Sequence, residues 1–394
     1  MSSLIKSTIC VVESICNPAR CTGCGLCAAQ CPKQCISMTV QDSLGHLYPS
    51  IDSNTCIDCG LCKRNCPVLR PPKREKAIMA YAGWSKDTED YRTSSSGGAA
   101  SVLSQTVLSQ GGVVYGCAML PDMEVRHIRV DKPEDIWKLK GSKYVQSSIA
   151  PIIPSLKKDV KAGRETLFIG TPCQVAAIRN LYENQPNNLF LIDLICHGVP
   201  SVALLREHVV RKVGTVPVET VFFRQGKVIC LGIVVSGKVV YKRAFDSPRY
   251  KDWYINTFFD GYTFRDSCYQ CQYACPERVS DMTIGDFWGL GKIVPAIEIP
   301  PHPDGCSVLL PNTEKGRDLV DRISAQMYLY ERTLAEAISG NEQLRHPYPM
   351  DLRKKAFRKF YPHIGRLAYY GVIADRYLGA QGNRIRKKLK RILK

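Results

Sequence analysis

The chain has 394 residues, of which 45% are hydrophobic and 9% aromatic, so it can bury a core across two or three domains and is not a disordered protein. No apolar run approaches the roughly 18 residues of a membrane-spanning helix, and the first residues do not resemble a signal peptide, so we expect a cytoplasmic location. The net charge of +18 is concentrated in residues 351–394, which hold 14 Lys and Arg against 2 acidic residues, and this distribution argues against a uniformly basic nucleic-acid surface.

Cysteine is the most unusual part of the composition. The chain contains 19 cysteines, and eleven of them fall within the first 66 residues. Disulfides are rare in a reducing compartment, which leaves metal ligation or redox chemistry as the expected role.

A duplicated pattern accounts for most of the early cysteines. The stretch "RCTGCGLCAAQCP" begins at Arg20, and "TCIDCGLCKRNCP" begins at Thr55, 35 residues later. Both follow C-x2-C-x2-C-x3-C-P, which is typical of a pair of 4Fe-4S clusters in which the fourth cysteine of each copy ligates the other cluster. The expected ligands are Cys21, Cys24, Cys27 and Cys66 for cluster one, and Cys56, Cys59, Cys62 and Cys31 for cluster two.

Zinc is the alternative for this region, because paired C-x2-C motifs also suit tetrahedral zinc. Zinc sites take four ligands from two pairs and would leave half of these cysteines without a purpose, so the pattern favours iron and sulfide. Cys10, Cys16 and Cys35 fall outside the repeat and are predicted to be packing residues.

Beyond residue 70 the pattern alternates strands and helices. We expect a linker at residues 71–76, a mixed-sheet domain over 77–345 and a basic helical tail over 346–394. Strands are predicted at 77–84, 112–119, 124–130, 166–170, 188–196 and 307–311, an antiparallel meander at 221–245, and helices at 97–110, from Pro172 and up to Ile323. The expected fold class is α+β or α/β, with a small N-terminal dicluster ferredoxin-like module (1–70) and a larger mixed-sheet domain.

Four segments of the larger domain carry chemical signals. "SSSGGAAS" (94–101) is a Gly-rich loop entering a helix, suited to a phosphate but equally to a flexible helix cap. Cys173 in "GTPCQ" and Cys196 in "DLICHG" each follow a buried strand, and Cys268 and Cys271 form a further C-x2-C. Singly these are core thiols more often than ligands, but together the four complete a plausible thiolate set, with Cys275 as an extra thiol beside it.

The motifs "SSSGGAAS", "GSKYVQS", "GTPCQ", "DLICHGVPS" and "ERVSDMTIGDFWG", in this order, resemble those of the family of coenzyme F420 hydrogenase and dehydrogenase beta subunits. The resemblance spans roughly residues 76–323 and implies FAD in the larger domain. Ser96, Gly97 and Gly98 would then line the FAD pyrophosphate, and Lys143, Tyr144 and Thr171 would lie near the flavin. It also implies a third 4Fe-4S cluster on Cys173, Cys196, Cys268 and Cys271.

These features predict an iron–sulfur flavoprotein oxidoreductase that exchanges electrons with a ferredoxin or other redox partner and acts on a small-molecule substrate. His197 is a candidate proton donor or a structural histidine, and Asp286 is predicted to be a turn residue. The resemblance offers two candidates for the substrate, a deazaflavin (coenzyme F420) and a compound of polysaccharide biosynthesis, and does not choose between them. The competing hypothesis is a non-catalytic electron-transfer subunit of a larger complex.

The end of the tail reads as an amphipathic basic helix. Ile385, Leu389, Ile392 and Leu393 share one face of "RIRKKLKRILK", with basic residues around the rest. Such a helix can lie on an anionic membrane, and a solvated tail is the equally weighted alternative.

Overall fold

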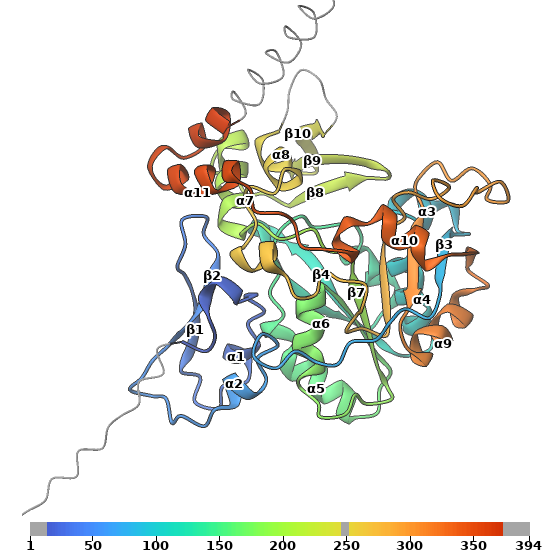
Figure 1. The fold of residues 1–394 in the computed structure, drawn as a ribbon, viewed down its shortest axis with the longest axis horizontal. Helices are drawn as coiled ribbons and strands as arrows, with labels where there is room; N and C mark the ends of the chain where they lie inside the picture. The colour runs from blue at the N-terminus through green and yellow to red at the C-terminus, as the bar shows by residue number, and fades with distance from the viewer. Residues whose placement is uncertain (1–13, 246–251, 373–394) are drawn as a thin grey trace, which may run out of the picture.

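The computed structural model describes residues 14–245 and 252–372, and its two cysteine-rich parts pack side by side (Figure 1). The N-terminal module is small: its helices and strands are η1 (Pro18–Arg20), α1 (Leu26–Ala29), β1 (Ile36–Val40), β2 (Leu47–Ile51) and α2 (Leu61–Arg64). Cys10 and the predicted amphipathic helix around Ile385 lie outside the described residues.

The duplication in the sequence is visible in the module. α1 and α2 are single turns that follow Gly25 and Gly60, and both glycines adopt left-handed conformations with φ of 77° and 69°. A Cβ disfavours this conformation, which explains glycine at this point of each copy. Gln30 and Asn65 also occupy equivalent positions, and Asn65 Nδ2 donates to Gln30 Oε1 at 2.7 Å, so equivalent points of the two copies face each other.

The large domain is built on an eight-stranded mixed sheet. In spatial order its strands are β13 (Met327–Arg332), β3 (Ala80–Ser85), β12 (Ser307–Pro311), β11 (Met282–Asp286), β7 (Leu189–Leu194), β6 (Thr166–Gly170), β4 (Val113–Leu120) and β5 (Glu124–Val130). The central strands β11, β7, β6 and β4 are parallel, and the outer pairings are antiparallel. The predicted fold class is therefore confirmed, and the predicted strands in this sheet are present within a few residues, while β11 and β13 were not predicted.

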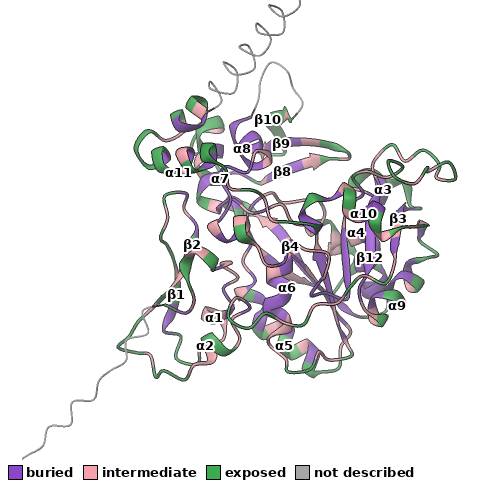
Figure 2. Cartoon of the chain, viewed as in Figure 1, coloured by how far each residue is buried: buried purple, intermediate pink, exposed green. Residues whose placement is uncertain are grey.

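Helices cover both faces of this sheet. On one face α5 (Ile153–Lys161) and α6 (Pro172–Arg179) pack on Phe168 and Leu191, and on the other α4 (Ala99–Ser109) and α9 (Glu314–Ile323) pack on Leu167 and Ile192. Adjacent residues of one strand thus face opposite sides, as the two-residue period of a strand requires. Burial is accordingly concentrated in the central strands (Figure 2).

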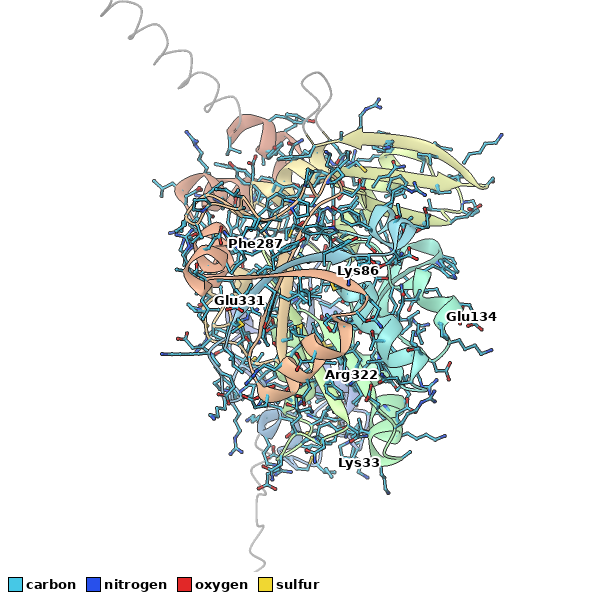
Figure 3. All side chains as sticks on the ribbon, turned by 90° about the vertical axis from the view of Figure 1, so that its right-hand side faces the viewer. Lys33, Lys86, Glu134, Phe287, Arg322 and Glu331 are labelled. Carbon is cyan, nitrogen blue, oxygen red and sulfur yellow. The ribbon has the colours of Figure 1, made fainter. Side chains whose placement is uncertain are left out.

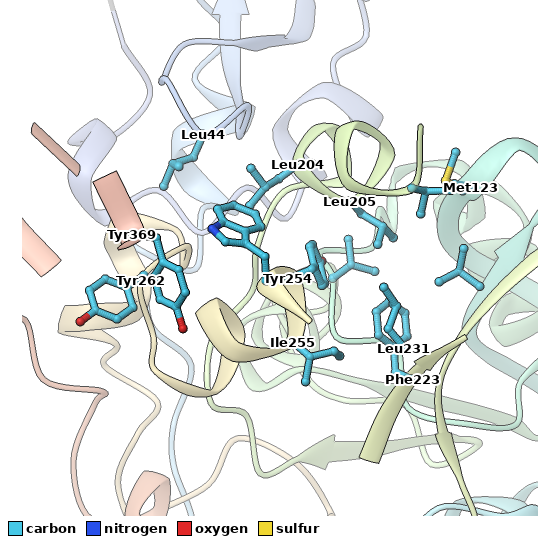
Figure 4. Packing of buried hydrophobic residues seen from close by; sticks show 14 of the residues in the cluster. Leu44, Met123, Leu204, Leu205, Phe223, Leu231, Tyr254, Ile255, Tyr262 and Tyr369 are labelled. Atoms are coloured by element: carbon cyan, nitrogen blue, oxygen red, sulfur yellow. The ribbon is translucent and has the colours of Figure 1, made fainter. Parts of the chain in front are cut away.

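The predicted meander forms a separate antiparallel sheet of three strands. The strands are β8 (Thr220–Gln225), β9 (Val228–Val235) and β10 (Lys238–Ala244), in the order β10-β9-β8. Its core includes α7 (Val202–Val213) and α8 (Trp253–Phe259), and also Leu44 of the N-terminal module (Figure 4).

The remaining elements are short, except for the last helix. They are η2 (Pro121–Met123), η3 (Pro133–Lys138), η4 (Ala150–Ile152), η5 (Asp266–Gln270), η6 (Glu342–Leu344), α3 (Thr88–Thr93), α10 (Leu334–Gly340) and α11 (Leu352–Ile364). η3 lies at an edge of the molecule, where Glu134 extends into solvent (Figure 3). Among the described residues, none of the helices combines the length and apolar character needed to cross a membrane.

The described part of the basic tail is not a solvated extension. Phe357, Tyr361 and Tyr369 are buried in the same core as Tyr254 of α8. Arg358 donates to the carbonyl oxygen of Phe264 at 2.8 Å. Residues 352–372 therefore pack against the folded core with one side, and Arg358 bonds to it.

Candidate iron–sulfur and ligand-binding site

The structure brings the cysteines of the duplicated motif into two groups. Cys66, the fourth cysteine of the second copy, lies with the thiols of the first copy. Burial raises the pKa of Cys27, and the charges of Cys24, Cys21 and Cys66 raise it further. In the other group, Cys31 shares one small cavity with the first three cysteines of the second copy, Cys56, Cys59 and Cys62. This is the crossed grouping that ligation of two clusters requires.

A third group of thiols lies in the large domain. Cys173 opens α6, Cys196 follows β7, and Cys268 and Cys271 lie in and just after η5. All four line one cavity of about 50 Å³. Burial, followed by the charges of the other three sulfurs, raises the pKa of Cys196 well above its ordinary value.

Cys275 has a different environment from these four. Its Sγ contacts the carbonyl oxygen of Glu277 at 3.1 Å, and it is not among the residues that line the thiol cavity. Arg74 Nη1 also donates to Cys275 Sγ at 3.5 Å. Cys275 thus contacts the backbone of its own loop. It lies near Cys271 but does not belong to the third thiol group.

Within each group the sulfur atoms lie close enough for their charges to shift one another's pKa. Within residues 14–245 and 252–372, no three or more His, Cys, Asp or Glu side chains converge in the way that would hold a single metal ion. The donor set is all sulfur, which is the ligand type that iron–sulfur clusters take.

Two cysteines predicted to be packing residues have a second role in the structure. Cys35 packs with Ile15 and Ile36, as expected, but its Sγ also lies 3.3 Å from Cys31 Sγ. Cys16 contacts both Cys21 and Cys66. The spacing of the cysteines along the chain carries no signal for either contact.

The N-terminal module is bonded to the segments that carry the third thiol group. Gln146 Nε2 donates to the carbonyl of Thr22 at 3.0 Å, and the fully buried Arg265 donates to the carbonyl of Cys21. Tyr273, between Cys271 and Cys275 in the chain, donates its hydroxyl to the carbonyl of Pro67 at 2.9 Å.

Cys24 and Cys173 therefore belong to neighbouring groups. Both pack against the same buried cluster, which contains Tyr273, and the charge of Cys173 is among the causes that raise the pKa of Cys24 to about 12, after burial. The first thiol group of the module and the third group are adjacent through this contact.

A cavity of about 580 Å³ lies beside the third group. This volume is within the range of about 300–1,000 Å³ for small-molecule sites. It opens at the carboxyl ends of the parallel strands, where Thr171 follows β6, Cys196 follows β7 and Asp286 ends β11, and ligands of open α/β sheets bind at this position.

The Ser- and Gly-rich loop forms one wall of the cavity. Ser96 and Gly98 line it, and Gly98 caps α4 with a φ of 83°. Gly97 does not line it: a Cβ there would lie 2.1 Å from the carbonyl oxygen of Gly83, so this glycine lets the loop pack on β3. Beneath the loop, the buried Asp90 pairs with Lys140 at 2.7 Å.

Lys143, Tyr144 and Thr171 also line the cavity. Lys143 Nζ donates to the carbonyls of Leu139 and Lys140, and burial lowers its pKa to about 8. Thr171 begins α6 in a capping box with Gln174, and its Oγ1 lies 3.3 Å from Cys173 Sγ. Thr171 thus links the cavity wall to the third thiol group.

Asp286 has a larger structural role than the predicted turn. It accepts hydrogen bonds from Ser96 Oγ at 2.6 Å and from Arg224 Nη1 at 3.0 Å. Arg224 comes from β8, so this ion pair joins the three-stranded sheet to the loop and the large sheet. The sequence holds no local signal for Arg224, because only the fold brings it to Asp286.

His197 lies where the two cavities meet, since it lines both. Burial lowers its pKa, although the charges of Asp286 and Glu342 act in the opposite direction. The imidazole is therefore held in its neutral form at pH 7, which suits a hydrogen-bond partner better than a cation.

Comparisons with known proteins agree with this arrangement. Residues 20–69 match the 4Fe-4S dicluster domain, residues 80–154 match the N-terminal part of the coenzyme F420 hydrogenase/dehydrogenase beta subunit, and residues 163–337 match the C terminus of that subunit.

A curated relative is one of the subunits of an F(420)H(2) dehydrogenase in Methanosarcina mazei, 23% identical over 185 residues, which are 45% of this chain. The chain spans about half (53%) of that relative's length. A solved structure, the F420-reducing [NiFe] hydrogenase complex from Methanosarcina barkeri, matches with a TM-score of 0.45 and 18% identity over 68% of this chain and 91% of the other.

The crossed thiol groups and the matching dicluster domain define an iron–sulfur protein with the features of an electron-transfer subunit. The two matches that follow, over most of the larger domain, identify it further: the chain belongs to the family of coenzyme F420 hydrogenase/dehydrogenase beta subunits.

Proposed function

We propose that this chain transfers electrons between its N-terminal clusters and a flavin, FAD, held in the 580 Å³ cavity, and thereby serves an oxidoreductase reaction. The observation that carries the proposal is that Cys24, Cys173 and Cys196, one from the module and two from the third group, line the same cavity as the Ser- and Gly-rich loop. A redox-active ligand in that cavity would lie against both thiol groups.

The residues of the cavity fit a dinucleotide. The loop at 94–98 leads into an eleven-residue helix, whose first backbone N–H groups and positive dipole end suit a pyrophosphate. The half-buried Lys143 adds a cation, and Phe258 and Phe259 supply flat apolar surface. A bound flavin supplies exchange of a hydride with an organic substrate and of single electrons with clusters.

The third cluster would be held by Cys173, Cys196, Cys268 and Cys271, with Cys275 outside it. The path would run from a ferredoxin or other redox protein through the module to this cluster. Cys59 is the one exposed thiol among the motif cysteines, which favours cluster two as the entry point. Peripheral membrane contact through residues 373–394 stays a prediction.

A specific alternative is an electron-transfer subunit that works only within a larger complex. It is favoured by the names of the relatives, which are a subunit of an F(420)H(2) dehydrogenase and a component of an F420-reducing hydrogenase complex. Under this alternative the substrate of the assembly is a deazaflavin, coenzyme F420. A reductase linked to polysaccharide biosynthesis is the other substrate proposal.

The test is anaerobic purification of the full chain with iron, acid-labile sulfide, zinc and flavin quantified together. We expect about twelve irons, matching sulfide and one flavin per chain, on the basis of three 4Fe-4S clusters. Zinc without sulfide would overturn the proposal, and clusters without flavin would remove its FAD part.

The third cluster is tested by Cys196→Ser, with Cys306→Ser as the matched control. Both cysteines lie next to strands of the large sheet, but Cys306 is not in a thiol group. We expect the first variant to lose about four irons and to slow flavin reduction, and the control to change neither. Turnover of coenzyme F420 by the chain alone would support the oxidoreductase function. Turnover only with a co-purifying enzyme would support the electron-transfer subunit.

A further inference from the structure

Two cysteines outside the repeat occupy equivalent positions around the two N-terminal thiol groups. Cys16 contacts Cys21, the first cysteine of copy one, and Cys66, the fourth of copy two. Cys35 contacts Cys31, the fourth cysteine of copy one, with 3.3 Å between the sulfurs, and Cys56, the first of copy two. Each extra thiol therefore touches the first cysteine of one copy and the fourth of the other.

This equivalence is not inherited from the sequence repeat. Cys16 precedes the first cysteine of copy one by five residues, whereas Cys35 follows the fourth cysteine of copy one by four. Shifting each by the repeat offset of 35 leads to Ile51 and Arg70, which are not cysteines. The two thiols thus reach equivalent places beside the two N-terminal thiol groups by different routes.

The chemistry of the contact follows from the ligands. A cysteine that binds iron is a thiolate and carries no proton, so in each contact only the extra thiol can donate. A hydrogen bond to a ligand sulfur stabilises the reduced cluster, which carries one more negative charge than the oxidised one. Such bonds are among the factors that set cluster potentials.

We propose that Cys16 and Cys35 are positioning residues that each donate an S–H hydrogen bond to a pair of iron-bound sulfurs, raising the reduction potentials of clusters one and two by a similar amount. Matched donors keep the two clusters close in potential, so that an electron passes between them without a large uphill step. The proposal rests on the dicluster module and is independent of the flavin.

The experiment uses the anaerobically purified full chain with Cys16→Ala, with Cys35→Ala and with both. Redox titration followed by electron paramagnetic resonance measures each cluster's midpoint potential. We expect each single variant to lower one midpoint, up to a tenfold fall in the reduced-to-oxidised ratio at a fixed potential (about 59 mV for one electron), and the double variant to lower both. Iron and acid-labile sulfide should stay at the level of the unmodified chain.

Three further variants make the result decisive. Cys16→Ser and Cys35→Ser keep a hydroxyl donor and should shift the midpoints less than the alanine variants. Cys230→Ala, which removes a fully buried thiol of β9, should leave all midpoints unchanged. Unchanged midpoints in Cys16→Ala and Cys35→Ala at full iron content would overturn the proposal. Loss of four irons from an alanine or a serine variant would also overturn it, because the thiol would then be a ligand.

Discussion

The N-terminal module and the third thiol group hold cysteines in opposite ways. The buried hydrophobic cluster around the module's thiols consists of Ile15, Cys35 and Ile36, and its helices are single turns. The third group instead stands on the ends of β7, α6 and η5, above extensive cores on both faces of the large sheet. This difference predicts that the fold of the module depends on its clusters, whereas the large domain would hold a cluster at the third thiol group on a core that stands without it.

Removing the iron should separate the two regions most clearly. Anaerobic chelation of the iron is expected to unfold residues 14–70, because so small a core cannot stabilise them alone, while β6 and β7 stay folded. Hydrogen exchange measured by mass spectrometry checks this, with fast exchange expected in β1 and β2 and continued protection in β6 and β7. Equal loss of protection in both regions would show that the comparison is wrong.

The next largest effect is expected from Arg278→Ala. Arg278 and Asp193 form a buried ion pair at 3.0 Å, and Arg278 also donates to the carbonyl of Tyr273, so it fixes the C-x2-C loop to β7. Removing the guanidinium leaves a buried carboxylate unpaired, which should lower the free energy of unfolding by about 3–5 kcal/mol.

The matched control for this variant is Arg317→Ala. Its pair with Glu314 is exposed, and its loss should cost about 0–1 kcal/mol. Denaturant unfolding under anaerobic conditions measures both variants. A cost for Arg278→Ala no larger than that of the control would contradict the role of this pair in holding the third group.

Much of this arrangement could be predicted from the sequence, because the decisive signals are local. The C-x2-C-x2-C-x3-C spacing places three predicted ligands within seven residues, and Gly25 and Gly60 mark the turns beside them. Apolar runs likewise located most of the large sheet, since adjacent residues such as Leu167 and Phe168 are both apolar and face two covered sides.

What sequence could not supply were contacts between distant segments. Arg224 meets Asp286 across 62 positions, and only the separate three-stranded sheet brings them together. Cys16 looked like a packing residue because its distance from Cys66 in the chain hides their contact. Gly97 matched a phosphate loop, yet its space is taken by Gly83 of β3, a fact that depends on strand order.

A smaller effect is expected from Gly97→Ala, which tests the loop without touching a thiol. The added methyl would overlap the Gly83 carbonyl, so the loop must move, at a cost of about 1–3 kcal/mol. We expect a lower flavin content at unchanged iron content. Gly371→Ala is the control, because a Cβ there meets nothing within 4 Å. Unchanged flavin in Gly97→Ala would argue against the loop as the binding element.

The smallest expected effect concerns pH and Lys143. Burial lowers the pKa of this side chain to about 8, so the free protein loses its charge as the pH rises through 8. An anionic ligand binds more tightly when Lys143 is protonated. The affinity should therefore fall about tenfold between about pH 7 and pH 9, which corresponds to a shift of about one pKa unit. Titration of FAD into flavin-free protein measures this.

The variant Lys143→Met sharpens the pH experiment. It keeps the apolar stem without the charge, so FAD affinity should be lower at pH 7 and independent of pH over the same range. A pH dependence that survives in this variant would assign the titration to another group.

The three-stranded sheet has a consequence for how such a protein diversifies. It is hydrogen-bonded as a ladder of its own, and it reaches the large cavity with Ile229 of β9, while Arg224 of β8 anchors it to Asp286. Exchanges of residues in this three-stranded sheet can alter which molecules enter the cavity without changing the register of the eight-stranded sheet or any residue of the three thiol groups. Substitutions in the three-stranded sheet can therefore change ligand specificity while the three thiol groups stay the same.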